Sequence, residues 1–424
     1  MNRIVRFSIS TLSAFIAMLC SFALVAHAQG STPAEPGPWP DSLRGRGGFT
    51  KEEVERLKAL KISGYIQADW LHFDRRDSAN GQAFYWDARK NLFTIRRGRV
   101  KLVYTSGNMR VTVQPDFTER GVVLKDAYGS VDLLPNEAFT VDVGLFLRPN
   151  FEVAYSSSHR ESPERSQVTL AFYPGERDLG FMFTSKLDLA DAFQPRIQLG
   201  MFNGEGTAPE RDPYKDIIAR VTLPLPFGAT SPVKANVGAS FYYGGIPQTD
   251  SMIVKVVNNA NRPAPNDATG SWAGWGNKRN VNVEAQVTMD LLGIGSTMLR
   301  GEFMTGQRPT FPSSSKLVEL RNQSGYYAYF IQNIGKHFQA VAKYDMFDRN
   351  TDLTGNFATS IADMASTVFG FGGNIFVDNL RITLWYDIPH IAEGELAKKD
   401  GNGDFLAFPD VKDNKGTIRF QYMF

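Results

Sequence analysis

The chain has 424 residues, and its 46 lysines and arginines almost balance its 44 aspartates and glutamates, for a net charge of +2. This balance gives no basic excess for nucleic-acid binding, so nucleic acid is not an expected partner. The only cysteine, Cys20, falls in an N-terminal segment that we expect to be removed, which excludes disulfides and zinc–thiolate sites in the mature chain.

Residues 1–28 have the features of a secretory signal peptide. Arg3 and Arg6 precede a long apolar run, and Ala26-His27-Ala28 places small residues at the two positions that determine cleavage. A retained transmembrane anchor is the alternative. Cleavage after Ala28 would remove both arginines and leave a mature net charge of zero.

Residues 29–61 are predicted to form a periplasmic lead with a short helix. The lead is rich in proline and glycine. Thr50 can cap the helix, and Val54, Leu57 and Leu60 form a narrow apolar stripe.

From residue 62 to residue 424 the pattern changes to strand alternation. In "VNVEAQVTMDLL", the apolar residues from Val281 to Leu291 share one face and polar residues share the other. Segments of about ten residues have the length that a tilted strand needs to cross a bilayer. The sequence predicts 16 strands, near 62–74, 91–105, 108–117, 121–132, 138–147, 178–187, 194–203, 215–224, 232–243, 280–291, 296–306, 324–333, 336–347, 366–377, 380–388 and 416–424.

The connections decide between a barrel and a soluble β-sandwich or propeller. Tight turns such as Ser106-Gly107-Asn108 alternate along the chain with long polar connections such as 244–279. Transmembrane barrels have short turns at one rim and long loops at the other. The predicted fold is therefore an all-β, antiparallel transmembrane barrel of about 16 strands in the cell outer membrane, surrounded by lipid. "QVTLAFYP" (167–174) is assigned to a loop, because a further strand would break the even count.

The final segment, "GTIRFQYMF", is predicted to close the barrel. Ile418, Phe420, Tyr422 and Phe424 share one face, which we expect to point to lipid. An aromatic C-terminal residue on such a strand is also the signal that the barrel assembly machinery recognises, so Phe424 is the predicted assembly signal.

A short basic ladder is predicted on the second strand. Val100, Leu102 and Tyr104 define its outward face, so Arg97, Arg99 and Lys101 point into the lumen, and Arg110 follows on the next strand. Fixed cations in a narrow pore favour anions. Neutralisation of these cations by inward-facing acids is the alternative.

The long connection after residue 147 is predicted to fold into the lumen as a constriction. It is too polar for lipid and rich in hydrogen-bonding groups; the alternative is a solvated outer loop. The predicted constriction residues are Arg148, Ser156, Ser157, Ser158, Arg160, Glu164 and Arg165.

These motifs resemble the phosphate-selective porin O and P family. "GLFLRP", a serine-rich stretch, "ERS" and "RDLGFMF" are similar to that family's pattern around its inward loop, and "FTIRRGRVKL" and "LKDAY" are similar to two of its strands. At Leu147-Arg148 the chain differs from the Lys-Glu that often precedes the family's proline. The resemblance implies a 16-stranded, usually trimeric channel in which basic residues guide phosphate or similar anions.

The predicted function is a water-filled diffusion channel for small anionic solutes, without a metal or cofactor. A weakly selective general porin is one alternative, and a plugged barrel with an adhesive or enzymatic role is another. An enzyme is not expected, because His159 beside the serines lacks a third member of a triad. "KDGNGDF" (399–405) resembles a calcium loop but has Phe405 where glycine is needed.

Overall fold

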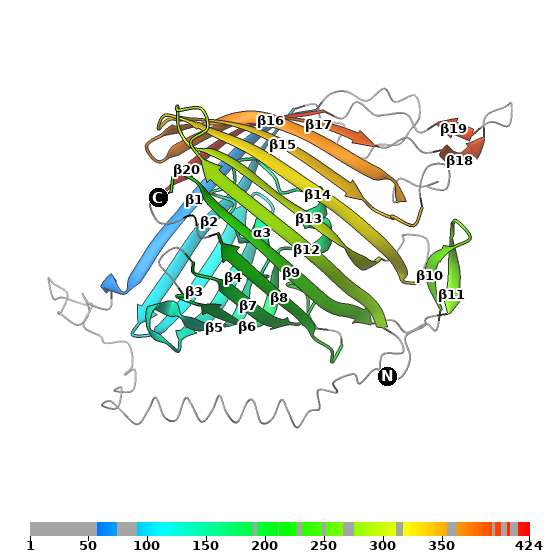
Figure 1. Cartoon of the computed structure of the whole chain (residues 1–424), viewed down its shortest axis with the longest axis horizontal. Coiled ribbons are helices and arrows are strands. Elements are labelled where there is room, and N and C mark those ends of the chain that lie inside the picture. Colours follow the sequence, from blue (N-terminus) through cyan, green and yellow to red (C-terminus); the bar gives the residue numbers. More distant parts are fainter. Residues whose placement is uncertain are drawn as a thin grey trace. The chain divides into compact units, whose positions relative to one another are not determined.

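The computed structural model describes residues from 57 to 424, with gaps (Figure 1). The described ranges are 57–73, 91–189, 193–210, 212–225, 227, 231–247, 252–265, 275–310, 317–353, 363–391, 395–399, 405–407 and 414–424. The predicted signal peptide and most of the predicted helix within 29–61 lie outside these residues.

Among the described residues, 16 strands form a closed antiparallel barrel, which confirms the predicted fold class. Their bounds are β1 (Leu60–Phe73), β2 (Asn91–Ser106), β3 (Met109–Thr118), β4 (Gly121–Asp132), β5 (Phe139–Leu147), β6 (Arg177–Lys186), β7 (Arg196–Phe202), β8 (Asp216–Pro224), β9 (Lys234–Pro247), β12 (Trp275–Met289), β13 (Thr297–Thr310), β14 (Glu319–Ile334), β15 (Phe338–Asp348), β16 (Ala365–Val377), β17 (Leu380–Ile391) and β20 (Lys415–Met423).

The strands follow one another around the barrel in chain order, each antiparallel to the next, and Figure 1 shows them strongly tilted. The last strand, β20, pairs with β17 on one side and with β1 on the other, which closes the sheet. Two hairpins inside long connections were not predicted: β10 (Met252–Val257) with β11 (Ala260–Pro265), and β18 (Glu395–Lys399) with β19 (Phe405–Ala407). No helix in the described part of the chain has the length and apolarity to span a membrane.

The alternation of each strand separates an apolar exterior from a polar interior. On β20, Arg419 and Gln421 are 1% and 0% exposed, whereas Phe420 and Tyr422 are 50% and 53% exposed. A soluble domain would bury the aromatic face and expose the charged one. The inverted arrangement is typical of a barrel whose exterior faces lipid.

The first strand contacts the C-terminal residue at Gly64. The backbone N–H groups of Gly64 and Phe424 donate to each other's carbonyls at 2.8 and 3.0 Å. A Cβ atom at Gly64 would lie only 2.4 Å from the Phe424 ring and 2.5 Å from the Arg99 carbonyl oxygen. Glycine at this position is what allows the terminal aromatic ring to pack against β1.

The connection from β5 to β6 contains two short helices, α3 (Phe151–Ala154) and α4 (Gln167–Phe172). Asn150 and Ser166 begin them, because each side chain accepts a hydrogen bond from a backbone N–H of the first turn. The stretch 167–174 is thus not a strand, as expected. Val153 and Phe172 are fully buried in an apolar cluster with residues of the barrel wall.

Candidate functional site

Residues 148–176, which we call the 148–176 segment, contact polar side chains on the inner face of the wall. Towards β13, the amide of Asn150 donates to Glu302 at 2.7 Å, and Glu161 forms an ion pair with Arg300 at 2.6 Å. Arg300 also lies over the ring of Tyr155, 4.2 Å from its centroid. These contacts attach one side of the segment to the wall.

The other side of the segment is attached where β20 meets β1. Gln67 and Gln421 are paired across that junction, 2.6 Å apart, and donate at 3.0 Å to the backbone carbonyls of Ser157 and Ser158 respectively. Ser157 is also hydrogen-bonded through its hydroxyl to Tyr65. The predicted serine run therefore holds the segment against the wall through both backbone and side-chain atoms.

Arg97 and Arg99 of the predicted basic ladder are buried, and each has a partner in the wall. Arg97 and Arg99 are 5% and 6% exposed. Arg97 donates to Gln67 at 3.0 Å, and Arg99 forms an ion pair with Asp116 at 2.9 Å. Lys101, two residues further along, is half-buried.

Arg110 does not share a site with Arg97 and Arg99. It forms ion pairs with Asp132 at 3.1 Å and with Glu137 at 2.8 Å, beside the turn between β4 and β5. Its side chain remains 29% exposed. Arg110 is thus part of a turn-side ion pair cluster rather than of the wall that the 148–176 segment contacts.

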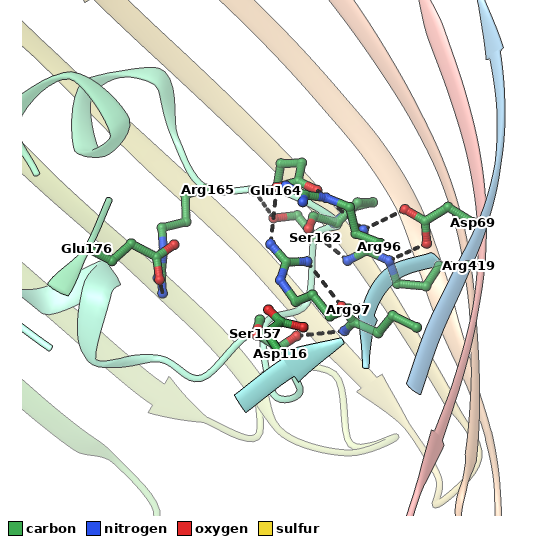
Figure 2. A network of polar contacts seen from close by, with 12 residues as sticks. Asp69, Arg96, Arg97, Asp116, Ser157, Ser162, Glu164, Arg165, Glu176 and Arg419 are labelled. Carbon is green, nitrogen blue, oxygen red and sulfur yellow. Dashed lines mark hydrogen bonds and ion pairs between the residues drawn. The ribbon is translucent and has the colours of Figure 1, made fainter. Parts of the chain in front are cut away.

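Glu164 of the segment binds three arginines of the wall (Figure 2). Arg96 holds both carboxylate oxygens, with Nε to Oε1 at 2.7 Å and Nη2 to Oε2 at 2.9 Å. Arg419 and Arg97 approach to 3.3 and 3.5 Å. Burial against the wall would raise the pKa of Glu164, but Arg97, Arg96 and other nearby cations outweigh it and hold this pKa well below its usual range.

The sequence did not identify Arg96 as a site residue, because regular strand alternation predicts that it points outward when Arg97 points inward. The register between β1 and β2 shifts at this point: Gln67 pairs with Arg97, whereas Ala68 pairs with Ile95. Arg96 is therefore the extra residue of a β-bulge, and bulges re-aim side chains. The sequence does contain a sign of the bulge: Ile95 and Val100 are both apolar, but a regular strand would place an odd-numbered and an even-numbered residue on opposite faces.

Arg419 connects the last strand to the first. Its guanidinium binds both oxygens of Asp69 at 2.7 and 2.8 Å and also donates to the carbonyl oxygen of Pro163 at 2.8 Å. Arg419 and Asp69 are 1% and 2% exposed. Figure 2 shows this pair next to Glu164, so the barrel junction and the segment share one network.

Arg160 differs from the other arginines of the segment. It is 2% exposed, and none of its three guanidinium nitrogens has a hydrogen-bond partner among the residues that the structure describes. Burial and the neighbouring Arg165 lower the pKa of Arg160 to about 10, so the group stays charged at neutral pH. Arg165 itself is paired with Glu176, at 2.7 and 3.1 Å.

The remaining predicted residues have structural contacts. Arg148 donates to the carbonyl oxygen of Pro174 and lies over the ring of Tyr173, 5.5 Å from its centroid. The hydroxyls of Ser156 and Ser158 are 2.9 Å apart. The described residues contain no cluster of three or more potential metal ligands, and the predicted calcium-loop mimic around Asp400 is largely outside them.

Comparisons with known proteins establish the fold. No family model matches the chain, and no curated protein matches it in sequence. Solved structures with the same fold include OprB of Pseudomonas putida (TM-score 0.58, 10% identity, 88% of this chain and 96% of that chain). An anion-selective porin from Comamonas acidovorans has a TM-score of 0.52 at 11% identity, over 86% of this chain and 99% of that one. The outer-membrane channel DcaP of Acinetobacter baumannii has a TM-score of 0.50 at 11% identity, over 86% and 97%. The chain therefore has the fold of outer-membrane porins.

Proposed function

We propose that the protein is an outer-membrane porin that carries small anions by diffusion. The apolar exterior, the polar interior and the shared porin fold support a channel that spans the outer membrane. The 148–176 segment would narrow this channel, since it contacts β1 and β20 on one side and β13 on the other. The preference for anions would be set at this narrow level.

The observation that carries the anion preference is Arg160. The guanidinium of Arg160 is buried without a hydrogen-bond partner among the described residues, although the carboxylates of Glu164, Glu176 and Glu152 act on its charge. Arg160 itself is buried, so its charge would act through space on a mobile anion passing the segment, since a fixed cation lowers the energy of a negative ion in a space with little screening. The neighbour from Comamonas acidovorans is an anion-selective porin, which agrees with this proposal.

Phosphate is the first anion to test. Guanidinium forks match the geometry of oxoanions, and the "FTIRRGRVKL" and "ERS" motifs resemble those of phosphate-selective porins. We further propose a homotrimer, removal of residues 1–28 on export and recognition of Phe424 during barrel assembly.

A weakly selective porin is the second candidate, and the ion pairs of the wall favour it. Several inward arginines are already neutralised, and such pairs attract neither sign of ion strongly. These pairs include Arg99–Asp116, Arg220–Glu284 and Arg300–Glu161.

Reconstitution into a planar bilayer tests the proposed function. We expect stepwise conductance in KCl, and a reduction of the chloride current when phosphate is added at constant ionic strength. Conductance without any effect of phosphate would keep the channel and remove phosphate as its solute. The absence of conductance from correctly folded protein would contradict the channel itself.

A further inference from the structure

The environment of Glu164 is that of a bound carboxylate ligand. Arg96 grips both of its oxygens in the side-on geometry with which a guanidinium recognises a carboxylate, and Arg97 and Arg419 add two further positive charges. Asp69 also pairs with Arg419, so two carboxylates face three arginines, which leaves a local excess of one positive charge. The wall residues form the receptor, and the chain's own segment supplies the occupant.

This carboxylate is within reach of solutes in the lumen. The side chains of Glu164 and Arg96 are 30% and 42% exposed. By contrast, Glu152 of the same segment is 1% exposed and is enclosed by hydrogen bonds from Ser166 and Tyr329. Glu164 can therefore exchange with a solute, whereas Glu152 is part of the packed interior.

Glu161 provides an internal comparison. It lies three residues before Glu164 and also pairs with a wall arginine, but among the described residues it has one ion pair, with Arg300 at 2.6 Å, and its side chain is 12% exposed. Arg300 is in turn covered by the rings of Tyr155 and Tyr329, 4.2 and 4.7 Å from their centroids. The Glu161 pair is therefore a closed attachment point, and the Glu164 site is an open one.

We propose that Arg96, Arg97 and Arg419 form a binding site for the carboxylate group of small organic acids, and that Glu164 is a tethered competitor for this site. The inference rests on the proposed anion channel, and it names the class of solute that the channel binds during passage. A solute carboxylate would take the place of Glu164 on the fork of Arg96 and then be released as Glu164 returns. A tethered group acts at an effective concentration in the millimolar range, so it prevents any one solute from remaining bound.

Block of the chloride current by propionate tests the proposal, because propionate is the side-chain analogue of glutamate. The full-length protein is measured as wild type, Glu164→Gln and Glu161→Gln, with phosphate as a second blocker. We expect Glu164→Gln to lower the half-blocking concentration of propionate by about tenfold, since the competitor is removed. Glu161→Gln removes the same charge and a segment-to-wall ion pair, and it should leave that concentration within about twofold of wild type.

The double variant Glu164→Gln with Arg96→Gln should not show the tighter block by propionate, because the guanidinium that binds the carboxylate is absent. Heat-modifiable migration on a gel verifies that each barrel is folded. If Glu164→Gln does not fold, Glu164→Asp withdraws the carboxylate by one methylene and should give a smaller shift in the same direction.

The possible outcomes separate this inference from the proposed function. Equal shifts of the half-blocking concentration of propionate in Glu164→Gln and Glu161→Gln, or no shift in either, would overturn the tethered-competitor site. The proposed channel would still stand if the wild type prefers anions. A larger gain for phosphate than for propionate would overturn the assignment to carboxylates. A wild type without anion preference would remove the proposed function on which the inference rests.

Discussion

Arg419 and Asp69 form a two-point ion pair that joins the last strand of the barrel to the first, with N–O distances of 2.7 and 2.8 Å across 350 positions of sequence. Both side chains are almost fully buried. The same guanidinium donates to Pro163 and approaches Glu164, so closure of the barrel and placement of the 148–176 segment depend on one residue.

Asp69→Asn should destabilise the barrel by about 3 kcal/mol, because it leaves the buried Arg419 with a neutral partner. The measurement is the temperature at which the folded, fast-migrating form disappears on a gel. Glu137→Gln is the control: it breaks ion pairs with Arg110 and with Lys186, but its side chain is 46% exposed, so the change should cost at most about 1 kcal/mol. Equal losses in the two variants would show that the Arg419–Asp69 pair has no special role in closure.

Gly64→Ala should lower the yield of folded barrel. The added methyl group would meet the Phe424 ring at 2.4 Å and the Arg99 carbonyl oxygen at 2.5 Å, and the backbone atom cannot move aside cheaply. Gly129→Ala is the control, since the nearest atom to its Cβ would be 3.9 Å away. Refolding into detergent measures both, and a normal yield for Gly64→Ala would contradict the packing described at the junction.

Arg160→Gln should weaken the anion preference and at the same time leave the barrel as stable as before or more stable. The variant removes a fixed cation from the segment, which we expect to reduce the chloride-to-potassium permeability ratio by about threefold. It also removes a buried guanidinium that has no hydrogen-bond partner among the described residues, which is an energetic cost in the wild type. A destabilised Arg160→Gln with unchanged selectivity would instead indicate that Arg160 is a structural residue.

The ion pairs of Glu164 and Glu176 should persist down to about pH 5 and weaken only in stronger acid. Despite their burial, nearby cations hold the pKa of Glu164 and Glu176 below the value of about 4.3 that a free glutamate has. Groups with a depressed pKa contribute their stability fully above the unfolded pKa and lose it as the pH falls through the folded pKa.

Conductance and reversal potential between pH 7 and pH 3 measure this effect. We expect the difference between the wild type and Glu164→Gln to be constant from pH 7 to about pH 5, and to shrink only in stronger acid as Glu164 is neutralised and its arginines are released. A transition of this difference centred between pH 5 and 6 would contradict the assignment to Glu164.

Most of the barrel was predictable from the sequence, because a strand between lipid and a polar lumen must alternate. That constraint acts locally, so it located strands such as β4 and β20 within one residue. It also identified the 148–176 segment as too polar for the lipid side.

The pairings within the site were not predictable, because they depend on long-range register. Nothing local relates Asp69 to Arg419, which meet only once the sheet has closed. The bulge at Arg96 adds one residue without changing the local composition, and it reversed the predicted direction of that side chain. The helix α3 has only four residues, too few to show a helical period.

The central claim is an anion-preferring channel, and the reversal potential of the wild-type protein in a planar bilayer under a KCl gradient tests it most directly. A potential displaced towards that of chloride would agree with the charge of Arg160 and the excess of arginine around Glu164. A potential near zero, or displaced towards that of potassium, would contradict the claim and would show that the ion pairs of the wall neutralise the lumen.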